Sequence, residues 1–416
     1  MTKVKKLLII LPDGFPNPWP AVVDLFGRYL PTYGVMSDLV TVRSEFSVGN
    51  ETWPAGRLFL APQSHNIILG HVLEFQNELR ALWKMKRGEY QGIQVRDKAI
   101  MAVFAILQAR RLGIPFFYWM SYPVHSSVAR MAMSRGTGIG MIRRIYLLVR
   151  GIIGGFILKL VVPHASQVFV LSEKMAELVL SWGVPAERIT VFPVGIDPEN
   201  FPDTPVTPAW DADLENKRII GYVGACDRLR NIDFLLDIVT ELRVTIPNVL
   251  LLIIGDAREE ADRQWLRDQI EKRNLAGAVF ITGWIPRREV RSWLCLAEVA
   301  LAYVARGPLF DVSSPIKILE YMAEGKAIVA NDNPDQVNLL NESGAGLCCA
   351  TETKAYANGI QTLLEDTILA CEMAQRGRPY VMRVRSYPKM AGRLSTTYHQ
   401  LMASPRSDQS APRLVD

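Results

Sequence analysis

One short segment, SSPIKILEYMAEGKAIVAND from residue 313 to residue 332, combines residue types that suit an anionic ligand. It is predicted to form a loop, a short helix and a buried strand. A helix that begins just after Pro315 points unpaired backbone N–H groups and the positive end of its dipole toward the preceding loop. Lys317 adds a cation there, whereas Glu320 repels phosphate and is better suited to accept hydrogen bonds from sugar hydroxyls. The combination predicts a site for a nucleotide diphosphate that carries a sugar.

Two more cations follow an earlier predicted strand, in the segment GYVGACDRLR. Arg228 and Arg230 come just after the end of this strand and its glycine, where the ligands of parallel sheets gather. The planar guanidinium of arginine suits phosphate because it can bind two oxygens at once. Two plainer interpretations stay open. Arg228 and Arg230 would form a solvated turn, and Lys317 with Glu320 would form a surface ion pair at positions i and i+3.

Short apolar runs alternate with longer amphipathic stretches along the chain, which is typical of parallel sheets buried on both faces. A first series of strands is predicted at residues 6–11, 38–42, 66–70, 115–120, 167–172 and 189–195. A second series is predicted at residues 218–224, 248–255, 278–283, 299–304 and 327–332. The expected fold class is therefore α/β, with two doubly wound domains. A hinge between them would place the ligand in a cleft beyond the carboxyl ends of the strands.

The composition limits the classes of protein to consider. The chain has 416 residues, of which 49% are hydrophobic and 21% charged, and this length exceeds what one hydrophobic core usually supports. Its net charge of +5 is mild and no long block of like charge occurs, which disfavours a nucleic-acid partner. The five cysteines form no CxxC pair, as expected for free thiols in a reducing cytosol. No structural metal is implied.

Two apolar segments invite a membrane interpretation. The start, MTKVKKLLIILPDGF, is predicted to be a buried strand and not a signal peptide, because Pro12 and Asp13 interrupt a very short apolar run. Residues 140–163 are long enough to span a bilayer, but the cations spread through them make spanning costly. These cations are Arg143, Arg144, Arg150 and Lys159. Two alternatives stay open: a helix at an anionic membrane surface, and a long core helix whose cations snorkel to solvent.

Taken in order, several segments resemble the retaining GT-B glycosyltransferases of family 4. The resemblance covers nearly the whole chain and is strongest in its second half. Its clearest carriers are VFVLSEKMAELVLSWGVPAERITVFPVGID, GYVGACDRLRNIDFLL, VLLLIIGD, VFITGWIP and SSPIKILEYMAEGKAIVAND. The resemblance implies the GT-B fold, in which two Rossmann-like domains face each other across a cleft. It also implies transfer of a sugar from a nucleotide-diphosphate donor to an acceptor hydroxyl, with retained anomeric configuration.

The resemblance also implies roles for single residues in the second half of the chain. A basic pair after the first strand of the C-terminal domain binds the donor diphosphate in this family, and Arg228 and Arg230 match it. Arg228 and Lys317 are expected to be catalytic, because cations near a helix N-terminus stabilise the charge that builds on the departing diphosphate. Glu320 matches the second of two family glutamates spaced eight apart, which usually holds the ribose.

The first glutamate of that pair is missing, and its position falls on Val312. Asp311, or the hydroxyls of Ser313 and Ser314, are therefore expected to contact the donor hexose instead. The departure also favours an alternative function, that of a catalytically inactive sugar-nucleotide-binding partner of a membrane polysaccharide assembly.

In the first half, PDGFPNPWP occupies the place of a flexible family loop near the donor phosphates. Gly14 is expected to bind the donor by letting the backbone approach it, and a plain strand-to-helix turn is the alternative. His125 lies where the family often has an active-site histidine and would polarise the donor sugar; a structural histidine is the alternative. Ser172 and Glu173 are expected to begin a helix, and Glu173 is not expected to act in catalysis.

No metal and no cofactor besides the donor substrate are expected. A metal-dependent GT-A enzyme would use an Asp-x-Asp motif, but Asp211 and Asp213 precede a predicted strand and are poorly placed to hold a cation. A nicotinamide-dependent dehydrogenase is disfavoured, because no G-x-G-x-x-G follows a strand at a helix start.

The expected domains are an N-terminal acceptor-side domain over residues 1–200, a linker over 201–215 and a nucleotide-sugar-binding domain over 216–383. A helix over 384–403 is expected to cross back to the first domain, and a tail over 404–416 to be disordered. The acceptor is expected to be a sugar or a lipid-linked sugar in polysaccharide or glycolipid biosynthesis. The expected location is the cytoplasm, with peripheral contact to the inner face of the cell membrane if residues 140–163 meet lipid.

Overall fold

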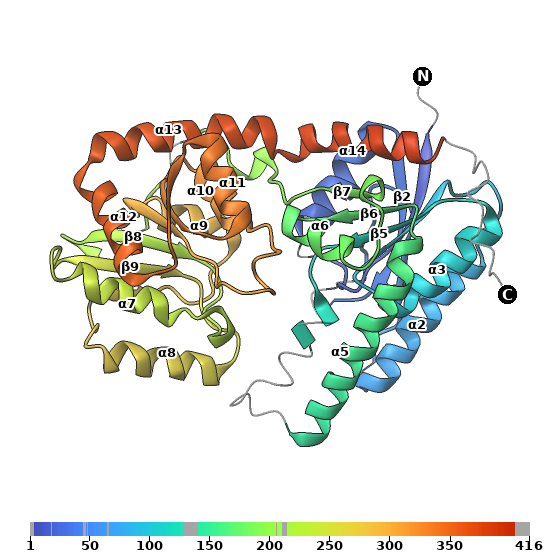
Figure 1. The fold of residues 1–416 in the computed structure, drawn as a ribbon, viewed down its shortest axis with the longest axis horizontal. Helices are drawn as coiled ribbons and strands as arrows, with labels where there is room; N and C mark the ends of the chain where they lie inside the picture. The colour runs from blue at the N-terminus through green and yellow to red at the C-terminus, as the bar shows by residue number, and fades with distance from the viewer. Residues whose placement is uncertain are drawn as a thin grey trace. The chain divides into compact units, whose positions relative to one another are not determined.

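The chain folds into two compact units, shown in a computed structural model that describes residues 4–17, 19–44, 47, 49–64, 66–125, 127–128, 140–204, 206–209 and 214–403 (Figure 1). The first unit consists of Met1–Pro193 together with Tyr387–Asp416, and the second of Val194–Ser386. The predicted tail over 404–416 and the Asp211 to Asp213 motif lie outside the described residues.

A parallel seven-stranded sheet forms the centre of the first unit, with the strand order β3-β2-β1-β4-β5-β6-β7. Its strands are β1 (Lys5–Ile10), β2 (Val35–Val42), β3 (Leu58–Ala61), β4 (Gly92–Arg96), β5 (Phe116–Met120), β6 (Gln167–Val170) and β7 (Ile189–Val191). In the central strands, Ile9 pairs with Leu39 on one side and with Gln94 on the other. All five residues of β5 are buried, as expected for a strand covered on both faces.

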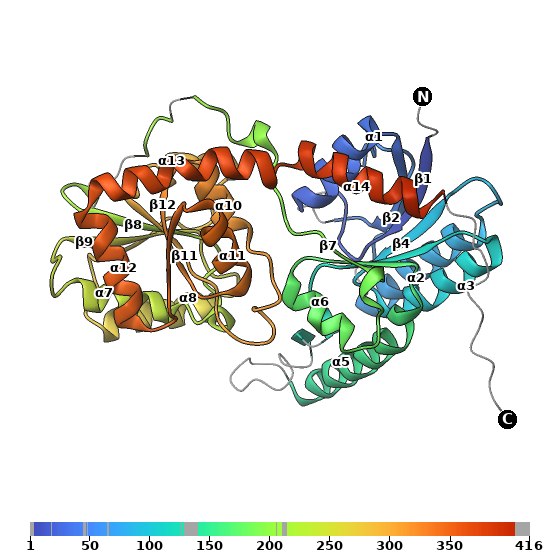
Figure 2. The same ribbon diagram turned by 45° about the horizontal axis from the view of Figure 1, so that its top comes forward.

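Helices cover both faces of this sheet (Figures 1 and 2). The π-helix η1 (Ala21–Tyr29), the short α1 (Leu30–Thr32) and α14 (Tyr387–Leu401) pack together, and their apolar side chains share one core with Trp119 and Phe169 of the sheet. The helices α2 (Ile67–Trp83), α3 (Ala99–Leu112) and α5 (Met141–Val161) lie side by side, with α3 between the other two. The remaining elements are η2 (Val162–His164), α6 (Glu173–Leu180) and η3 (Ala186–Arg188).

A parallel six-stranded sheet forms the centre of the second unit, with the order β10-β9-β8-β11-β12-β13. Its strands are β8 (Arg218–Val223), β9 (Val249–Ile254), β10 (Val279–Ile281), β11 (Val299–Ala302), β12 (Ala327–Asn331) and β13 (Gly346–Cys349). Its helices are η4 (Pro198–Asn200), η6 (Arg228–Arg230), α7 (Asp233–Leu242), α8 (Glu260–Lys272), α9 (Arg287–Leu294), α10 (Ile316–Ala323), α11 (Pro334–Ser343), α12 (Thr353–Glu365) and α13 (Thr367–Val384).

Two hydrophobic clusters, one on each face, bury this second sheet. Residues of α7, α8 and α12 build one cluster, and residues of α9, α10, α11 and α13 build the other. Both units are thus parallel α/β domains of the Rossmann type, which confirms the predicted fold class.

Two predictions about the chain's course are wrong. Residues 66–70 were predicted to be a strand, but they begin α2, because the Asn66 side chain accepts a hydrogen bond from the Leu69 N–H at 3.1 Å and so caps the first turn. The prediction also missed the strands β3, β4 and β13, which are only four or five residues long.

The predicted boundary at residue 200 and the predicted linker over 201–215 are also wrong in position, because the second unit already begins at Val194. Arg378 and Arg291 donate hydrogen bonds to the carbonyl oxygens of Phe201 and Pro202, at 2.7 and 3.1 Å. The Phe201 side chain is buried in the core of the second unit. This part of the segment therefore belongs to the second unit.

The helix α14 supplies a sharp test of the fold, because it is distant in sequence from the unit that it completes. Leu394 is buried in the core of the first unit, whereas Thr396 on the same helix is exposed. We expect Leu394→Ala to lower the free energy of unfolding by about 2–5 kcal/mol, through lost burial and the cavity left behind. Thr396→Ala should change it by less than about 0.5 kcal/mol. Urea unfolding followed by tryptophan fluorescence measures both, and equal effects would contradict the packing described for α14.

Candidate functional site

Lys317 lies in the first turn of α10, at the carboxyl edge of the second sheet. The buried side of α10 anchors the helix in the core and leaves Lys317 and Glu320 on the other side. It consists of Ile318, Leu319, Tyr321, Met322 and Ala323. The Lys317 ammonium donates a hydrogen bond to the Tyr303 carbonyl oxygen at 2.9 Å and lies 4.0 Å from the centre of the Tyr222 ring. Burial, followed by repulsion from Arg230, lowers the pKa of Lys317 to about 7.

The interpretation of Lys317 and Glu320 as a surface ion pair is therefore wrong. Within the described part of the chain, Lys317 has no carboxylate within ion-pair distance, and the ion-pair partner of Glu320 is Arg287, with 3.6 Å between Nη2 and Oε1. An ammonium donates up to three hydrogen bonds. A ligand oxygen near Lys317 would therefore find both a donor and a positive charge.

Of the two predicted arginines, only Arg230 is brought toward Lys317. It is half-exposed, its Nε lies 3.8 Å from Asp227, and its charge contributes to the lowered pKa of Lys317. Both groups therefore present positive charge to the region in front of α10.

Arg228 has a different environment, and its expected role at the diphosphate is not supported. Its Nε lies 3.0 Å from Asp262 of α8, its Nη2 donates to the Ala261 carbonyl at 2.8 Å, and its guanidinium lies 5.5 Å from the Trp265 ring centre. The side chain thus ties η6 to α8. The sequence does not reveal this contact, because Asp262 lies far along the chain from Arg228.

A cavity of about 670 Å³ lies entirely within the second unit; it is lined by Glu320, one helical turn beyond Lys317, and not by Lys317 itself. Its floor is formed by the ends of β8 and β9, where Gly224 and Gly255 have φ angles of +148° and +140°. A Cβ on Gly255 would lie only 2.3 Å from the Gly224 carbonyl oxygen, so these two strand ends need glycine to approach each other. The position beyond the carboxyl ends of parallel strands is where such sheets bind ligands.

Glu320 contributes to the wall of this cavity, as do Tyr321 and Glu324 of the same helix. Burial raises the pKa of Glu320, and the charges of Arg287 and Lys317 oppose this effect. A carboxylate in such a wall can accept two hydrogen bonds from neighbouring hydroxyls. The predicted placement of Glu320 one helical turn beyond the cation thus matches the geometry.

Another part of the lining comes from residues that the sequence analysis did not single out. Trp284 and Ile285 follow β10, and Arg287 begins α9. The Trp284 side chain is largely exposed, and its indole N–H donates to the Ala257 carbonyl at 3.3 Å. The segment VFITGWIP carried part of the resemblance. Its glycine and proline come directly after a predicted strand, and this pattern could have predicted a loop that faces a ligand.

The loop before α10 does not offer the hydroxyls that were expected to contact the hexose. The Ser313 hydroxyl donates to the Phe310 carbonyl at 2.6 Å. The buried Ser314 hydroxyl donates to Asp335 at 2.8 Å. Asp311 accepts from Arg306 at 2.8 Å, and Val312 is buried. These side chains hold the loop, and their predicted role as donor ligands is not supported by their contacts.

Gly14, in the loop after β1, lies against the chain of the same unit. A Cβ at this position would lie 2.9 Å from Cα of Ser44, so glycine is required by close backbone packing. Nearby, the Trp19 indole donates to Asp13 at 3.1 Å, and Arg96 lies 3.9 Å from the same carboxylate. These contacts support the plainer interpretation of a strand-to-helix turn.

His125 also has a structural environment. Its ring fits against Gly154 of α5, where a Cβ would lie 2.0 Å from Nδ1, and it is hydrogen-bonded to the backbone of Arg150. Burial and the Arg150 charge lower the pKa of His125, so the ring is neutral at pH 7. The structural alternative is therefore the better supported one.

The helix cap that was expected at Ser172 is confirmed, because the Ser172 hydroxyl accepts a hydrogen bond from the Met175 N–H at 3.1 Å.

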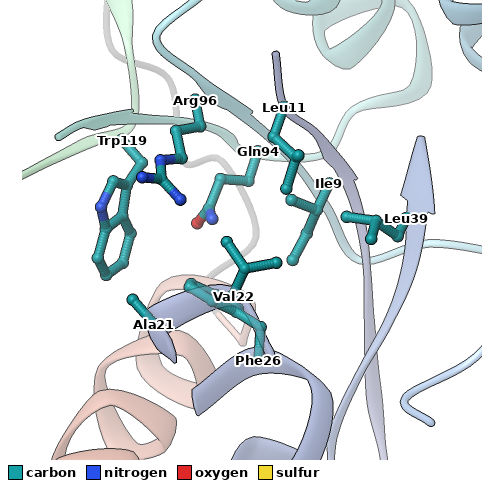
Figure 3. Close-up of a pocket in the computed structure, with 9 residues that line it drawn as sticks. All are labelled: Ile9, Leu11, Ala21, Val22, Phe26, Leu39, Gln94, Arg96 and Trp119. Carbon is teal, nitrogen blue, oxygen red and sulfur yellow. The ribbon is translucent and has the colours of Figure 1, made fainter. Parts of the chain in front are cut away.

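A second, much smaller cavity lies in the first unit (Figure 3). Gln94 and Arg96 of β4 and Trp119 of β5 line it, with Val22 and Phe26 of η1 on the other side. Its volume of about 20 Å³ has room for about one water molecule and none for a sugar. Arg96 is held there by the Ser121 hydroxyl at 3.0 Å.

Comparison with solved structures shows the same fold at low sequence identity. Sucrose-phosphate synthase from Thermosynechococcus elongatus matches with a TM-score of 0.69 and 18% identity, over 96% of this chain and 99% of its own. HepE from Anabaena, solved in complex with UDP-glucose, matches with 0.65 and 16%, over 94% and 99%. WaaG, a glycosyltransferase involved in lipopolysaccharide biosynthesis, matches with 0.61 and 13%, over 94% and 99%. Among curated proteins no sequence matches this chain.

Two protein families match the sequence directly, one in each unit. Residues 24–195 match the family described as glycosyl transferase 4-like domain. Residues 210–379 match the family described as glycosyl transferases group 1. Together the two matches span most of the chain and coincide with the two parallel-sheet units, and the chain therefore belongs to the GT-B glycosyltransferases.

Proposed function

We propose that this glycosyltransferase binds a nucleotide-diphosphate sugar in the second unit and transfers the sugar to an acceptor hydroxyl with retained anomeric configuration. The observation that carries the proposal is Lys317, a half-buried cation beside Arg230 with no ion-pair partner in the part of the chain that the structure describes. Two close cations repel each other, and an anion between them would relieve this repulsion. A diphosphate is the anion that the family implies.

The large cavity supports the rest of the donor assignment. In this proposal the nucleoside occupies the cavity beyond Gly224 and Gly255, with the ribose hydroxyls donating to Glu320. The diphosphate then lies at the start of α10, where the helix N-terminus and Lys317 favour negative charge. Trp284 offers an exposed aromatic face for the base. Complexes of HepE from Anabaena with UDP and with UDP-glucose are consistent with a uridine nucleotide as donor.

The chemical step needs stabilisation of the leaving group. The bond between the anomeric carbon and the diphosphate oxygen breaks, a bond to the acceptor oxygen forms on the same face, and the acceptor's proton passes to the departing diphosphate oxygen. Negative charge builds on the departing diphosphate, and Lys317 and Arg230 are placed to stabilise it. These cations take the role that a divalent ion has in GT-A enzymes, so we propose transfer without a metal and without a further cofactor.

We propose that the acceptor is a sugar or a lipid-linked sugar in polysaccharide or glycolipid biosynthesis, and that the protein works in the cytoplasm. The likeness to WaaG supports this choice. A second candidate is a catalytically inactive sugar-nucleotide-binding partner, which the buried Val312 in place of the family's first glutamate favours.

A panel of sugar nucleotides tests the proposed donor. A ligand that binds only the folded state should raise the midpoint of thermal unfolding by roughly 5 °C or more at about 100 times its Kd. We expect this shift with at least one sugar nucleotide, and a clearly smaller shift with Lys317→Met. No shift with any member of the panel would contradict the proposal. Release of nucleotide from labelled donor by the purified protein, with transfer of the sugar, would exclude the inactive alternative.

The two arginines of η6 give a matched pair of variants. We expect Arg230→Ala to weaken binding of the matching nucleoside diphosphate by about 10- to 100-fold, because a charged hydrogen bond to phosphate is lost. Arg228→Ala should leave this affinity within about threefold and lower the free energy of unfolding by about 0.2–1 kcal/mol, because its ion pair with Asp262 is half-exposed. Isothermal titration calorimetry and urea unfolding measure the two quantities. The reverse order of affinities would contradict the assignment.

The lowered pKa of Lys317 predicts proton uptake on binding. At pH 8 the free side chain, with a pKa of about 7, is mostly neutral, and a bound diphosphate favours the ammonium. Binding should therefore take up as much as about one proton, and the affinity for the diphosphate should fall as the pH rises from 7 to 9.

The contribution of Lys317 to the free energy of unfolding changes with pH in the opposite direction. Between about 7 and 10.5 the unfolded state binds more protons at this residue, so the contribution of Lys317 to folding becomes more favourable as the pH rises.

Titration of nucleoside diphosphate at pH 8 in two buffers of different ionisation enthalpy measures this uptake. Lys317→Met is the control and should bind without it. Equal uptake by both proteins would place the titrating group elsewhere.

A further inference from the structure

The helix α5 in the first unit exposes a continuous apolar stripe. Its members recur every three or four residues, and Ile142 and Phe156 are 87% and 62% exposed. The stripe consists of Ile142, Ile145, Val149, Ile152, Ile153, Phe156 and Leu160. Contiguous exposed apolar surface of this kind marks an interaction site on a folded protein. The earlier alternative of a core helix is therefore wrong for this face.

The opposite side of α5 fixes the helix to its unit. Leu147, Gly151, Gly154 and Leu158 are buried and follow a second stripe, and α5 packs along α3 (Figures 1 and 2). By length and composition alone, Met141–His164 would be long and apolar enough to cross a membrane, with a mean hydropathy of 2.1. A spanning helix would have to leave this contact with α3. If α5 keeps its contact with α3, only its exposed apolar stripe can contact a membrane.

The charges beside the stripe are all positive. At 100° per residue, Arg143 and Arg150 border one side of the stripe and Lys159 borders the other, whereas Arg144 is half-buried beside Gly151. Neither α5 nor its neighbour α3 contains an aspartate or a glutamate. An apolar stripe between rows of cations matches the hydrocarbon and headgroup layers of an anionic membrane.

The same character continues onto α3. Ile100 and Leu107, two turns apart, are about half-exposed, and the last turn of α3 carries the exposed Arg110 and Arg111. The acids on the next helix, Glu74 and Glu78 of α2, are occupied by ion pairs with Lys98. The exposed charges of α3 and α5 are therefore all cations.

We propose that the face formed by α5 and α3 docks on an anionic lipid bilayer, with α5 lying in the plane of the interface and its apolar stripe among the acyl chains. This inference deepens the proposed function, because a surface at the membrane would bring the protein to lipid-linked acceptors. Binding to the bilayer does not depend on binding of the donor, so an experiment can contradict the membrane proposal without contradicting the proposed function, and the reverse.

Co-sedimentation of the full-length protein with vesicles tests the proposal. We expect binding to vesicles that contain phosphatidylglycerol, little binding to pure phosphatidylcholine, and release at high salt. Ile142→Ser with Phe156→Ser should lower the partition coefficient by at least about tenfold, because apolar burial drives insertion. Arg143→Glu with Arg150→Glu should lower it by at least about 25-fold, at roughly fivefold for each cation removed.

Matched variants in the second unit serve as controls. Ile368→Ser removes a side chain that is 74% exposed, and Lys272→Glu with Lys354→Glu reverses two exposed cations. Neither control should change binding to the vesicles. Thermal shift with the matching sugar nucleotide, without lipid, should be unchanged in all four variants and reports the donor site separately.

Three outcomes would overturn the proposal. One is no sedimentation with anionic vesicles at low salt. Another is a wild-type dimer that becomes monomeric in Ile142→Ser with Phe156→Ser, since a second copy would then cover the face. The third is resistance of the vesicle-bound protein to extraction at alkaline pH, which would show that the helix spans the bilayer.

Discussion

The donor site depends on one electrostatic constraint, a lysine held in a partly apolar setting beside a second cation. Lys317 contacts a carbonyl oxygen and an aromatic face and is repelled by Arg230. Such a group lowers the stability of the charged, ligand-free protein. The cost is offset when an anion enters, because the same low-dielectric setting then strengthens the attraction. The unfavourable free state and the favourable bound state have the same origin.

The rest of the second unit holds this lysine one helical turn from Glu320, which lines the cavity. Parallel strands end at one edge, and the two glycines after β8 and β9 let these strand ends approach each other where they line the cavity. The buried side of α10 fixes the rotation of that helix, so that the cation and Glu320 emerge on the same side. In the first unit, by contrast, the cavity beside Arg96 is small, and the notable surface is the apolar, cationic face of α5 and α3. The two units thus have separate chemical characters.

Much of this was predictable from local patterns. The two parallel sheets follow from short apolar runs, and the placement of Lys317 and Glu320 follows from a helix start after Pro315 and a spacing of three. The site predictions that the structure does not support concern residues whose contacts are distant in sequence. Arg228 is drawn to Asp262, and Ser314 to Asp335, and neither partner is evident from the local pattern. Gly14 and His125 are explained by neighbours on other elements, Ser44 and Gly154. The Trp284 wall was missed because a single exposed tryptophan after a strand has no periodicity to mark it.

A crystal structure with a bound nucleoside diphosphate tests the central claim most directly. The account predicts diphosphate oxygens within hydrogen-bond distance of the Lys317 ammonium and the Arg230 guanidinium, in front of the first turn of α10, with the ribose hydroxyls on Glu320. A nucleotide bound elsewhere, or one whose phosphates leave Lys317 in contact only with the Tyr303 carbonyl and the Tyr222 ring, would contradict it.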